Sequence, residues 1–237
     1  MNILDLIFPK RCLGCGRIGL PAGKAGKYFC DTCRFSVKFI AQNEAICPVC
    51  EKPAIDGATH PGCQTKYSLD GLTSFFRYDG IIRKAVKALK YRYVSDLAHE
   101  FISLIPSYRI NELTKLRSYK ASLAPIPLHP SRFRFRGFNQ AEILGKLVSK
   151  RLNIPMQTDR LKRIKKITPQ VEMKHREDRL KNMIGVFATN NLALRQSSGQ
   201  AILLFDDVFT TGATMRSAAN VLKREGAKFV WAVTMAR

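Results

Sequence analysis

Residues 202–214 read ILLFDDVFTTGAT, and this stretch decides the fold class. An apolar run that ends in two carboxylates and a hydroxyl-rich turn is typical of a buried parallel strand that carries polar groups to its carboxyl end. Neighbouring side chains on a strand point to opposite sides, so Asp206 and Asp207 can hold a diol between them. Open α/β sheets bind ligands at this edge, and we therefore predict a ligand site here.

The turn after the acids has the composition of an anion-binding loop. Gly212 allows a tight turn in which backbone N–H groups converge on one point, and the neighbouring threonines add hydroxyls. Apolar residues then recur at helical spacing: Met215, Ala218, Ala219 and Leu222. A helix N-terminus favours phosphate, so the site would suit a phosphosugar. The alternative is an ordinary capped helix without a ligand, but caps do not require paired acids ahead of the turn.

Residues 202–214 resemble the phosphoribosyl pyrophosphate (PRPP) signature of type I phosphoribosyltransferases. The resemblance implies that Asp206 and Asp207 hold the ribose hydroxyls and that Mg²⁺ binds together with PRPP. It also implies a loop for the 5′-phosphate, which consists of Thr210, Thr211, Gly212, Ala213 and Thr214.

Composition predicts a folded protein of one or two domains. The chain has 237 residues, of which 46% are hydrophobic and 9% aromatic, and this is enough for a real core. Asp5 interrupts the apolar residues near the N-terminus, and no long apolar run follows. We therefore expect neither a signal peptide nor a membrane span, and we expect a cytoplasmic protein.

Seven cysteines indicate metal binding rather than disulfides, because their number is odd and no export signal is recognised. The first four form a CxxC-x14-CxxC pattern, which can place four thiolates around one tetrahedral Zn²⁺. Four thiolates fill the coordination shell, so this zinc would be structural. The predicted ligands are Cys12, Cys15, Cys30 and Cys33.

A second zinc site is predicted where CxxC is followed by HxxC. Its ligands would be Cys47, Cys50, His60 and Cys63, which leaves no cysteine unpaired. The alternative is a loop histidine beside three free thiols. Residues 1–66 contain few apolar anchors outside these motifs, so metal binding should contribute directly to their folding.

The net charge of +22 predicts an attraction to polyanions. Residues 109–181 contain nineteen Lys or Arg and six Asp or Glu, whereas residues 1–66 contain nine and five, so most of the excess lies in the middle of the chain. Arginines alternate there with aromatic rings at residues 132–138, which suits phosphates and unpaired bases. The alternatives are a mobile active-site loop for residues 132–138 and a solvated helix face for residues 160–166.

Strands and helices alternate along the rest of the chain. Strand candidates lie near residues 74–78, 123–127, 185–188, 201–205 and 229–233, with amphipathic helical segments between several of them. This order predicts an α/β fold with three layers and a largely parallel sheet. We expect a small zinc-ribbon module at residues 1–66 and a phosphoribosyltransferase-like domain at residues 67–237.

Several motifs together resemble the ComF/GntX family over nearly the whole chain: the CxxC knuckles, RYDG, LKYRY, PIPLHPSR, RGFNQ, residues 176–182 and FDDVFTTGAT. Competence members of that family help to bring single-stranded DNA into the cytoplasm during natural transformation. The resemblance implies a pyrophosphate loop formed by Ile126, Pro127, Leu128 and His129. It also implies an adjacent flexible loop at residues 132–140. The composition of this loop and of the second basic cluster predicts the nucleic-acid contacts: Arg132, Arg134, Arg136, Phe138, Asn139, Gln140, Lys162, Arg163, Lys165 and Lys166.

Three functions remain open from the sequence. The first is a DNA-handling protein of the competence pathway that binds single-stranded DNA, PRPP or a related phosphosugar, and DNA-translocation or DNA-processing proteins. The second is an active phosphoribosyltransferase in nucleotide salvage, in which PRPP is attacked at its anomeric carbon as pyrophosphate leaves. The third is a PRPP-sensing regulator without catalysis. Nothing in the sequence identifies an acceptor base.

Overall fold

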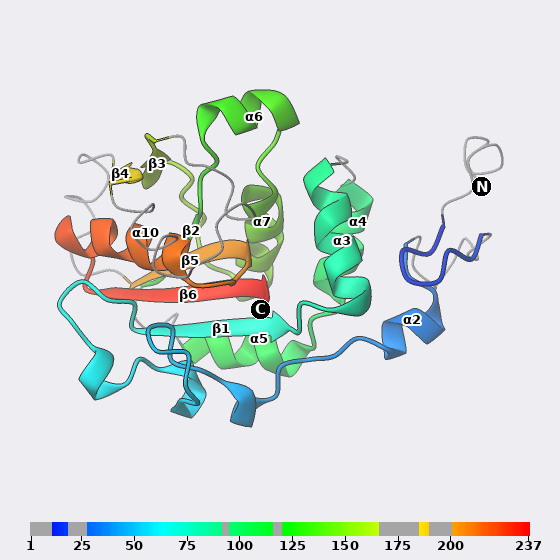
Figure 1. The fold of residues 1–237 in the computed structure, drawn as a ribbon, viewed down its shortest axis with the longest axis horizontal. Helices are drawn as coiled ribbons and strands as arrows, with labels where there is room; N and C mark the ends of the chain where they lie inside the picture. The colour runs from blue at the N-terminus through cyan, green and yellow to red at the C-terminus, as the bar shows by residue number, and fades with distance from the viewer. Residues whose placement is uncertain (1–10, 19–27, 92–94, 116–119, 166–184, 190–200) are drawn as a thin grey trace.

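The computed structural model describes residues 11–18, 28–91, 95–115, 120–165, 185–189 and 201–237. Its centre is a four-stranded sheet in the order β1-β6-β5-β2, in which all neighbouring strands are parallel (Figure 1). The strands are β1 (Gly71–Phe76), β2 (Ser122–Pro125), β5 (Ala201–Val208) and β6 (Phe229–Ala236). The predicted largely parallel sheet is therefore confirmed.

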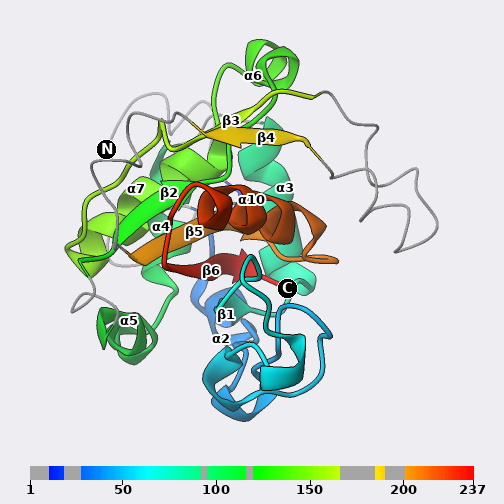
Figure 2. The same ribbon diagram turned by 90° about the vertical axis from the view of Figure 1, so that its left-hand side faces the viewer.

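Side chains on alternate positions of β5 build the cores of the two faces. Leu203 and Phe205 belong to a cluster with one group of helices, whereas Ile202 and Leu204 pack on the opposite face. The first group consists of α3 (Gly80–Tyr91), α4 (Ser95–Ser103), α5 (Ser107–Thr114) and α7 (Gln140–Leu152). The second face is covered by α10 (Ala213–Arg224) and by the antiparallel pair of β3 (Leu161–Arg163) and β4 (Phe187–Thr189) (Figure 2). This is the predicted three-layer α/β fold.

The cysteine-rich segment runs along the β1 edge of the sheet (Figure 1). The Ile40 N–H donates to the Phe75 carbonyl at 3.0 Å, and the Thr59 N–H donates to the Asp70 carbonyl at 2.9 Å. Glu100 on α4 accepts hydrogen bonds from the backbone N–H groups of Tyr28 and Phe29. The segment's short helices are α2 (Asp31–Phe35), η1 (Gln42–Glu44), η2 (Ile55–Gly57) and η3 (Pro61–Cys63). The domain boundary at residue 66 stays a prediction.

The basic clusters differ locally from the sequence expectations. Residues 130–136 form a short helix, α6 (Pro130–Arg136), where a flexible loop was implied, because Pro130 suits the first helical turn and His129 caps it. Within residues 160–166, Leu161–Arg163 form β3, so a helix face there is wrong. Lys166 and residues 176–182 lie outside the described part of the chain.

Candidate functional site

The two predicted acids lie in the last three residues of β5 and face opposite sides of the sheet. The strand continues to Val208, so both carboxylates lie within the strand rather than beyond its end. Asp206 shares the α10 face, and its Oδ1 accepts a hydrogen bond of 2.8 Å from the Asp207 N–H. Burial, together with the neighbouring Asp207 carboxylate, raises the pKa of Asp206 to about 8. A bound cation would therefore be favourable beside this carboxylate.

Asp207 lies on the α3 and α7 face and is held by two side chains. Lys90 Nζ, in the last turn of α3, lies 3.0 Å from Asp207 Oδ2, and Gln140 Nε2 donates to the same oxygen at 3.4 Å. Arg136 donates in turn to Gln140 Oε1 at 3.1 Å. Burial opposes the charge on Lys90, but the Asp207 carboxylate outweighs it and raises the pKa of Lys90 above its ordinary value. The carboxylate is thus fixed from both helices.

The predicted phosphate loop joins β5 to the N-terminus of α10. Gly212 occupies the N-cap position with φ +68°, where a Cβ would lie 2.4 Å from the Phe209 ring. The Thr211 hydroxyl is buried and has no hydrogen-bond partner among the described residues. Arg216 donates to the Thr211 carbonyl and, at 2.8 Å, to the Val49 carbonyl in the second cysteine knuckle. The loop is therefore tied directly to the cysteine-rich segment.

The predicted pyrophosphate loop, residues 126–129, starts at the neighbouring strand end. The Ile126 N–H donates to the Phe205 carbonyl at 2.8 Å, and Asn139 Nδ2 donates to the Ile126 carbonyl at 3.0 Å. Thus Asn139 fastens this loop to α7, and it also caps that helix through its Oδ1. The loop begins beside the strand that carries the acids.

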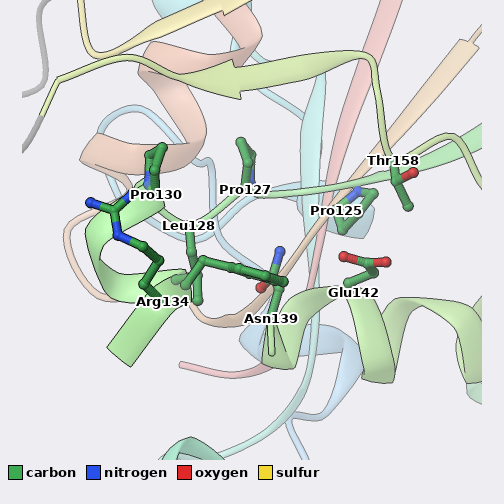
Figure 3. A pocket seen from close by; sticks show the side chains of 9 residues that line it. Pro125, Pro127, Leu128, Pro130, Arg134, Asn139, Glu142 and Thr158 are labelled. Carbon is green, nitrogen blue, oxygen red and sulfur yellow. The ribbon is translucent and has the colours of Figure 1, made fainter. Parts of the chain in front are cut away.

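A cavity of about 410 Å³ opens beside the same loop. Figure 3 shows Arg134 of α6 on one side, Glu142 of α7 and Thr158 on the other, and prolines between them. Phe133 also lines it, whereas neither acid of β5 does. Its largely apolar lining carries one cation, Arg134, and one acid, Glu142, and the cavity is separate from the acidic pair.

The predicted nucleic-acid contacts fall into exposed and buried groups. Arg134, Lys162 and Lys165 are exposed, Arg132, Arg136 and Phe138 are half-buried, and Asn139, Gln140 and Arg163 are buried. Asn139 and Gln140 support the site from within the protein, as described above. Arg163 lies in β3 with its guanidinium 5.7 Å from the centre of the Phe187 ring. Arg134, Lys162 and Lys165 are therefore the predicted contacts that are most open to solvent.

Both predicted metal-ligand sets come together in space. Within each set, all ligand atoms lie within 4.8 Å of one another; the sets are Cys12, Cys15, Cys30 and Cys33, and Cys47, Cys50, His60 and Cys63. The backbone N–H groups of Cys30, Cys15 and Gly14 overcome the opposing effect of burial and lower the pKa of Cys12 to about 6. A lowered thiol pKa favours the thiolate that binds metal at Cys12, whereas burial and the hydrogen bonds of the neighbouring cysteines raise the pKa of Cys33 to about 12. The arrangement indicates two structural zinc ions.

The two knuckles share a backbone conformation that their spacing alone does not reveal. The first CxxC pair of each ligand set is followed by a residue with positive φ, Gly16 at +76° and Glu51 at +62°. His60 Nδ1 lies 3.3 Å from Cys50 Sγ, while His60 Nε2 lies 2.9 Å from the Pro53 carbonyl. A carbonyl only accepts, so Nε2 carries the proton and Nδ1 is left to bind metal. This geometry fits His60 as a ligand.

Sequence reasoning missed two residues that hold the site. Lys90 lies in the LKYRY run, but nothing local shows that the end of α3 meets β5. Arg216 follows Gly212 by one helical turn, and its contact with Val49 joins positions far apart in the chain. The sequence offered one signal for Lys90. It is a lysine at the end of an amphipathic helix, in a chain that also contains a predicted acidic site.

Comparisons with known proteins agree with this architecture. Residues 3–64 match the double zinc ribbon domain family. The chain is 28% identical over 211 residues to competence protein ComFC of Bacillus subtilis (strain 168), covering 86% of this chain and 81% of that protein. It is 27% identical over 209 residues to competence protein ComFC of Streptococcus pneumoniae, covering 88% and 87%. It is 25% identical over 233 residues to the DNA utilization protein YhgH of Escherichia coli (strain K12), covering 95% and 96%.

No helix in the described ranges combines the length and the apolar character needed to cross a lipid bilayer.

Proposed function

Because this chain belongs to the ComF-type family of competence proteins with a double zinc ribbon, we propose that it binds PRPP or a related phosphosugar and handles single-stranded DNA during natural transformation. In this proposal residues 1–66 form the zinc module and residues 67–237 form the ligand-binding domain. The relatives' names connect the family with competence and with DNA utilization. The PRPP site is inferred from the resemblance of residues 202–214 to the PRPP signature, together with the geometry of the acidic pair and the loop.

One observation carries the phosphosugar part of the proposal: the acidic pair, the half-buried Lys90 and a helix N-terminus meet at one sheet edge. Asp207 is oriented by Lys90 and Gln140, so it can accept hydrogen bonds from a ribose without first being ordered. The buried, unpartnered hydroxyl of Thr211 and the N–H groups at the start of α10 are available to a 5′-phosphate.

Mg²⁺ would enter with PRPP. Carboxylate and phosphate oxygens are its preferred ligands. Burial first, and then the neighbouring Asp207 carboxylate, raise the pKa of Asp206, and a cation would favour its charged form. The ion would supply charge neutralisation to the diphosphate. The chain's own residues would orient the sugar through Asp206 and Asp207 and exclude water through the buried strand end.

The DNA part of the proposal depends on the exposed surface of α6 and β3. Phe135 is 84% exposed and Phe133 46%, and they alternate with arginines along α6. Exposed aromatic rings can stack on unpaired bases while guanidinium groups meet phosphates. The cavity next to Phe133 and Arg134 adds an apolar wall to this surface.

Turnover is the second candidate function, and the intact acidic pair and loop favour it. An incoming nucleophile would attack the anomeric carbon while pyrophosphate leaves with the bonding electrons, so no protein nucleophile is required. Pyrophosphate release from PRPP with candidate bases tests this reaction. Binding of PRPP without release would favour a sensor or a DNA-handling role.

Binding of a labelled single-stranded oligonucleotide, with and without PRPP and Mg²⁺ and over a range of salt concentrations, tests the proposal. We expect binding whose logarithm falls linearly with the logarithm of salt concentration, because several phosphates are neutralised. Phe135→Ala should weaken it, whereas Phe35→Ala should not, although Phe35 is similarly exposed at 89%. Absence of oligonucleotide binding would contradict the DNA part.

A further inference from the structure

Each zinc-ligand set opens with a CxxC knuckle, and the two knuckles have the same backbone hydrogen bonds. In the first knuckle, residues 12–16, and in the second knuckle, residues 47–51, the N–H of the last residue donates to the carbonyl of the first at 2.9 Å. The N–H of the first residue donates to the carbonyl of the residue after the knuckle, Arg17 at 3.0 Å and Lys52 at 2.9 Å. The knuckles are therefore equivalent turns, and their corresponding atoms can be compared.

A cation of the α/β domain holds the same carbonyl in each knuckle. Lys84 Nζ of α3 donates to the Gly14 carbonyl in the first knuckle at 2.7 Å. Arg216 Nη1 of α10 donates to the Val49 carbonyl in the second knuckle at 2.8 Å. Gly14 and Val49 both precede the second cysteine of their CxxC motif. Helices on opposite faces of the sheet thus clamp the two knuckles at the same position.

The clamp on the second knuckle continues into the predicted phosphate loop, residues 210–214. The Arg216 guanidinium donates to the Thr211 carbonyl as well as to the Val49 carbonyl, and the bond to Val49 is partly buried. The Arg216 backbone N–H donates to the Gly212 carbonyl at 2.8 Å. Within the described ranges, Lys84 makes no bond to this loop. One side chain therefore connects the second knuckle, but not the first, to the loop.

The position of the Val49 carbonyl depends on the second metal site. Val49 lies between two of its predicted ligands, Cys47 and Cys50, and the other two ligands come from residues 60–63. Metal binding contributes folding free energy in such small modules, so the second knuckle should loosen when the site is empty. Three thiolates around one Zn²⁺ also leave a net negative charge, which favours the Arg216 guanidinium beside the knuckle.

We propose that Arg216 is a positioning residue through which the second zinc site holds the 210–214 loop in its ligand-binding conformation. The first zinc site, clamped by Lys84, has no part in this link. The role of the loop as a ligand site rests on the proposed function, whereas the link itself lies within the protein. Coupling between two sites is reciprocal, so a ligand that orders the loop also stabilises the second knuckle.

Hydrogen exchange of the zinc-loaded full chain, followed by mass spectrometry, tests the link without a phosphosugar. Arg216→Gln replaces a fork of donors by one amide, so amide exchange should quicken about tenfold at residues 210–216 and in the second knuckle, a factor usual for coupled sites. Zinc content should not change. Lys84→Gln is the matched control, because it removes the corresponding bond of the first knuckle. It should quicken exchange in the first knuckle and leave residues 210–216 unchanged.

A double-mutant cycle distinguishes coupling from independent local loosening. Cys63→Ser removes a ligand of the second site, and it should quicken exchange at residues 210–216 when Arg216 is present. In the Arg216→Gln background the same substitution should add nothing further at these residues, because the link is already broken. Additive increases would mean that the two changes act independently and would overturn the inference. If Cys63→Ser does not fold, the comparison of Arg216→Gln with Lys84→Gln still decides.

Calorimetric titration with ribose 5-phosphate, and with PRPP and Mg²⁺, connects the link to the ligand. Both compounds carry the 5′-phosphate that the loop is proposed to bind, so Arg216→Gln should weaken both about tenfold, and Lys84→Gln should bind both like the wild type. Arg216→Lys keeps the charge but not the planar fork, so its affinity should lie between those of the wild type and Arg216→Gln. PRPP should also slow amide exchange in the second knuckle of the wild type, but not in that of Arg216→Gln.

The possible failures can be told apart. Equal exchange at residues 210–216 in the wild type and Arg216→Gln, or an equal increase in Lys84→Gln, would overturn the inference while the proposed function stands. If the wild type binds neither PRPP nor ribose 5-phosphate, the proposed phosphosugar function fails. The exchange of the Arg216 variants then still decides whether the second zinc site and the loop are linked.

Discussion

Replacing Gly212 by alanine should distort the phosphate loop more than it destabilises the fold. At φ +68° an L-residue costs about 1–2 kcal/mol. The new Cβ would also lie 2.4 Å from the ring of Phe209, which is buried, so either the ring or the loop must move. Overpacking of this kind costs about 1–3 kcal/mol, which gives a total of about 2–5 kcal/mol.

Gly226 provides the matched control at the other end of α10. Its φ is +105°, but a Cβ there meets nothing within 4 Å, so Gly226→Ala carries backbone strain without the collision. Urea unfolding followed by circular dichroism gives the stability of each variant, and calorimetry gives its affinity for PRPP and Mg²⁺. We expect Gly212→Ala to lose at least about tenfold in affinity and Gly226→Ala to bind like the wild type. The reasoning is refuted if Gly212→Ala binds PRPP normally.

Three further predictions concern the zinc sites, their link to the loop, and pH. Cys12→Ser and Cys47→Ser should each lower the zinc content from two ions to one per chain, measured by elemental analysis; unchanged content would contradict the ligand sets. Arg216→Gln removes charged hydrogen bonds to two carbonyls, each worth about 1.5–3 kcal/mol, so PRPP affinity should fall although zinc is retained. Because the pKa of Asp206 rises from 3.8 to about 8 on folding, its contribution to stability is present at low pH and is lost as pH rises through 8. Between pH 6 and 9, at constant zinc concentration, the free energy of unfolding should therefore decline less for Asp206→Asn than for the wild type.

The sequence predicts the parts of the fold that depend on local pattern. The apolar run before Asp206 specifies a strand that is buried on both faces, and its alternate residues do divide between two cores. The CxxC and HxxC spacings identify both ligand sets, because a knuckle is formed by residues close together in the chain.

The parts that could not be predicted depend on contacts between distant segments. The ion pair of Lys90 and Asp207 joins α3 to β5, and no periodicity specifies which helix end meets which strand. Arg163 was grouped with its exposed neighbours by composition, but the register of β3 turns it inward while Lys162 faces outward. A strand of three residues is too short for the alternation of buried and exposed positions to be recognised from the sequence, because most of the residues around it are basic.

Titration of the full chain with PRPP and Mg²⁺ by calorimetry, repeated with Asp207→Asn, tests the phosphosugar site most directly. The substitution keeps the size of the side chain but removes the charge that Lys90 and Gln140 hold in place. We expect the wild type to bind PRPP and the variant to lose most of that affinity while its zinc content and fold are retained. Equal PRPP binding by the two proteins would contradict the assignment of the site to Asp206 and Asp207.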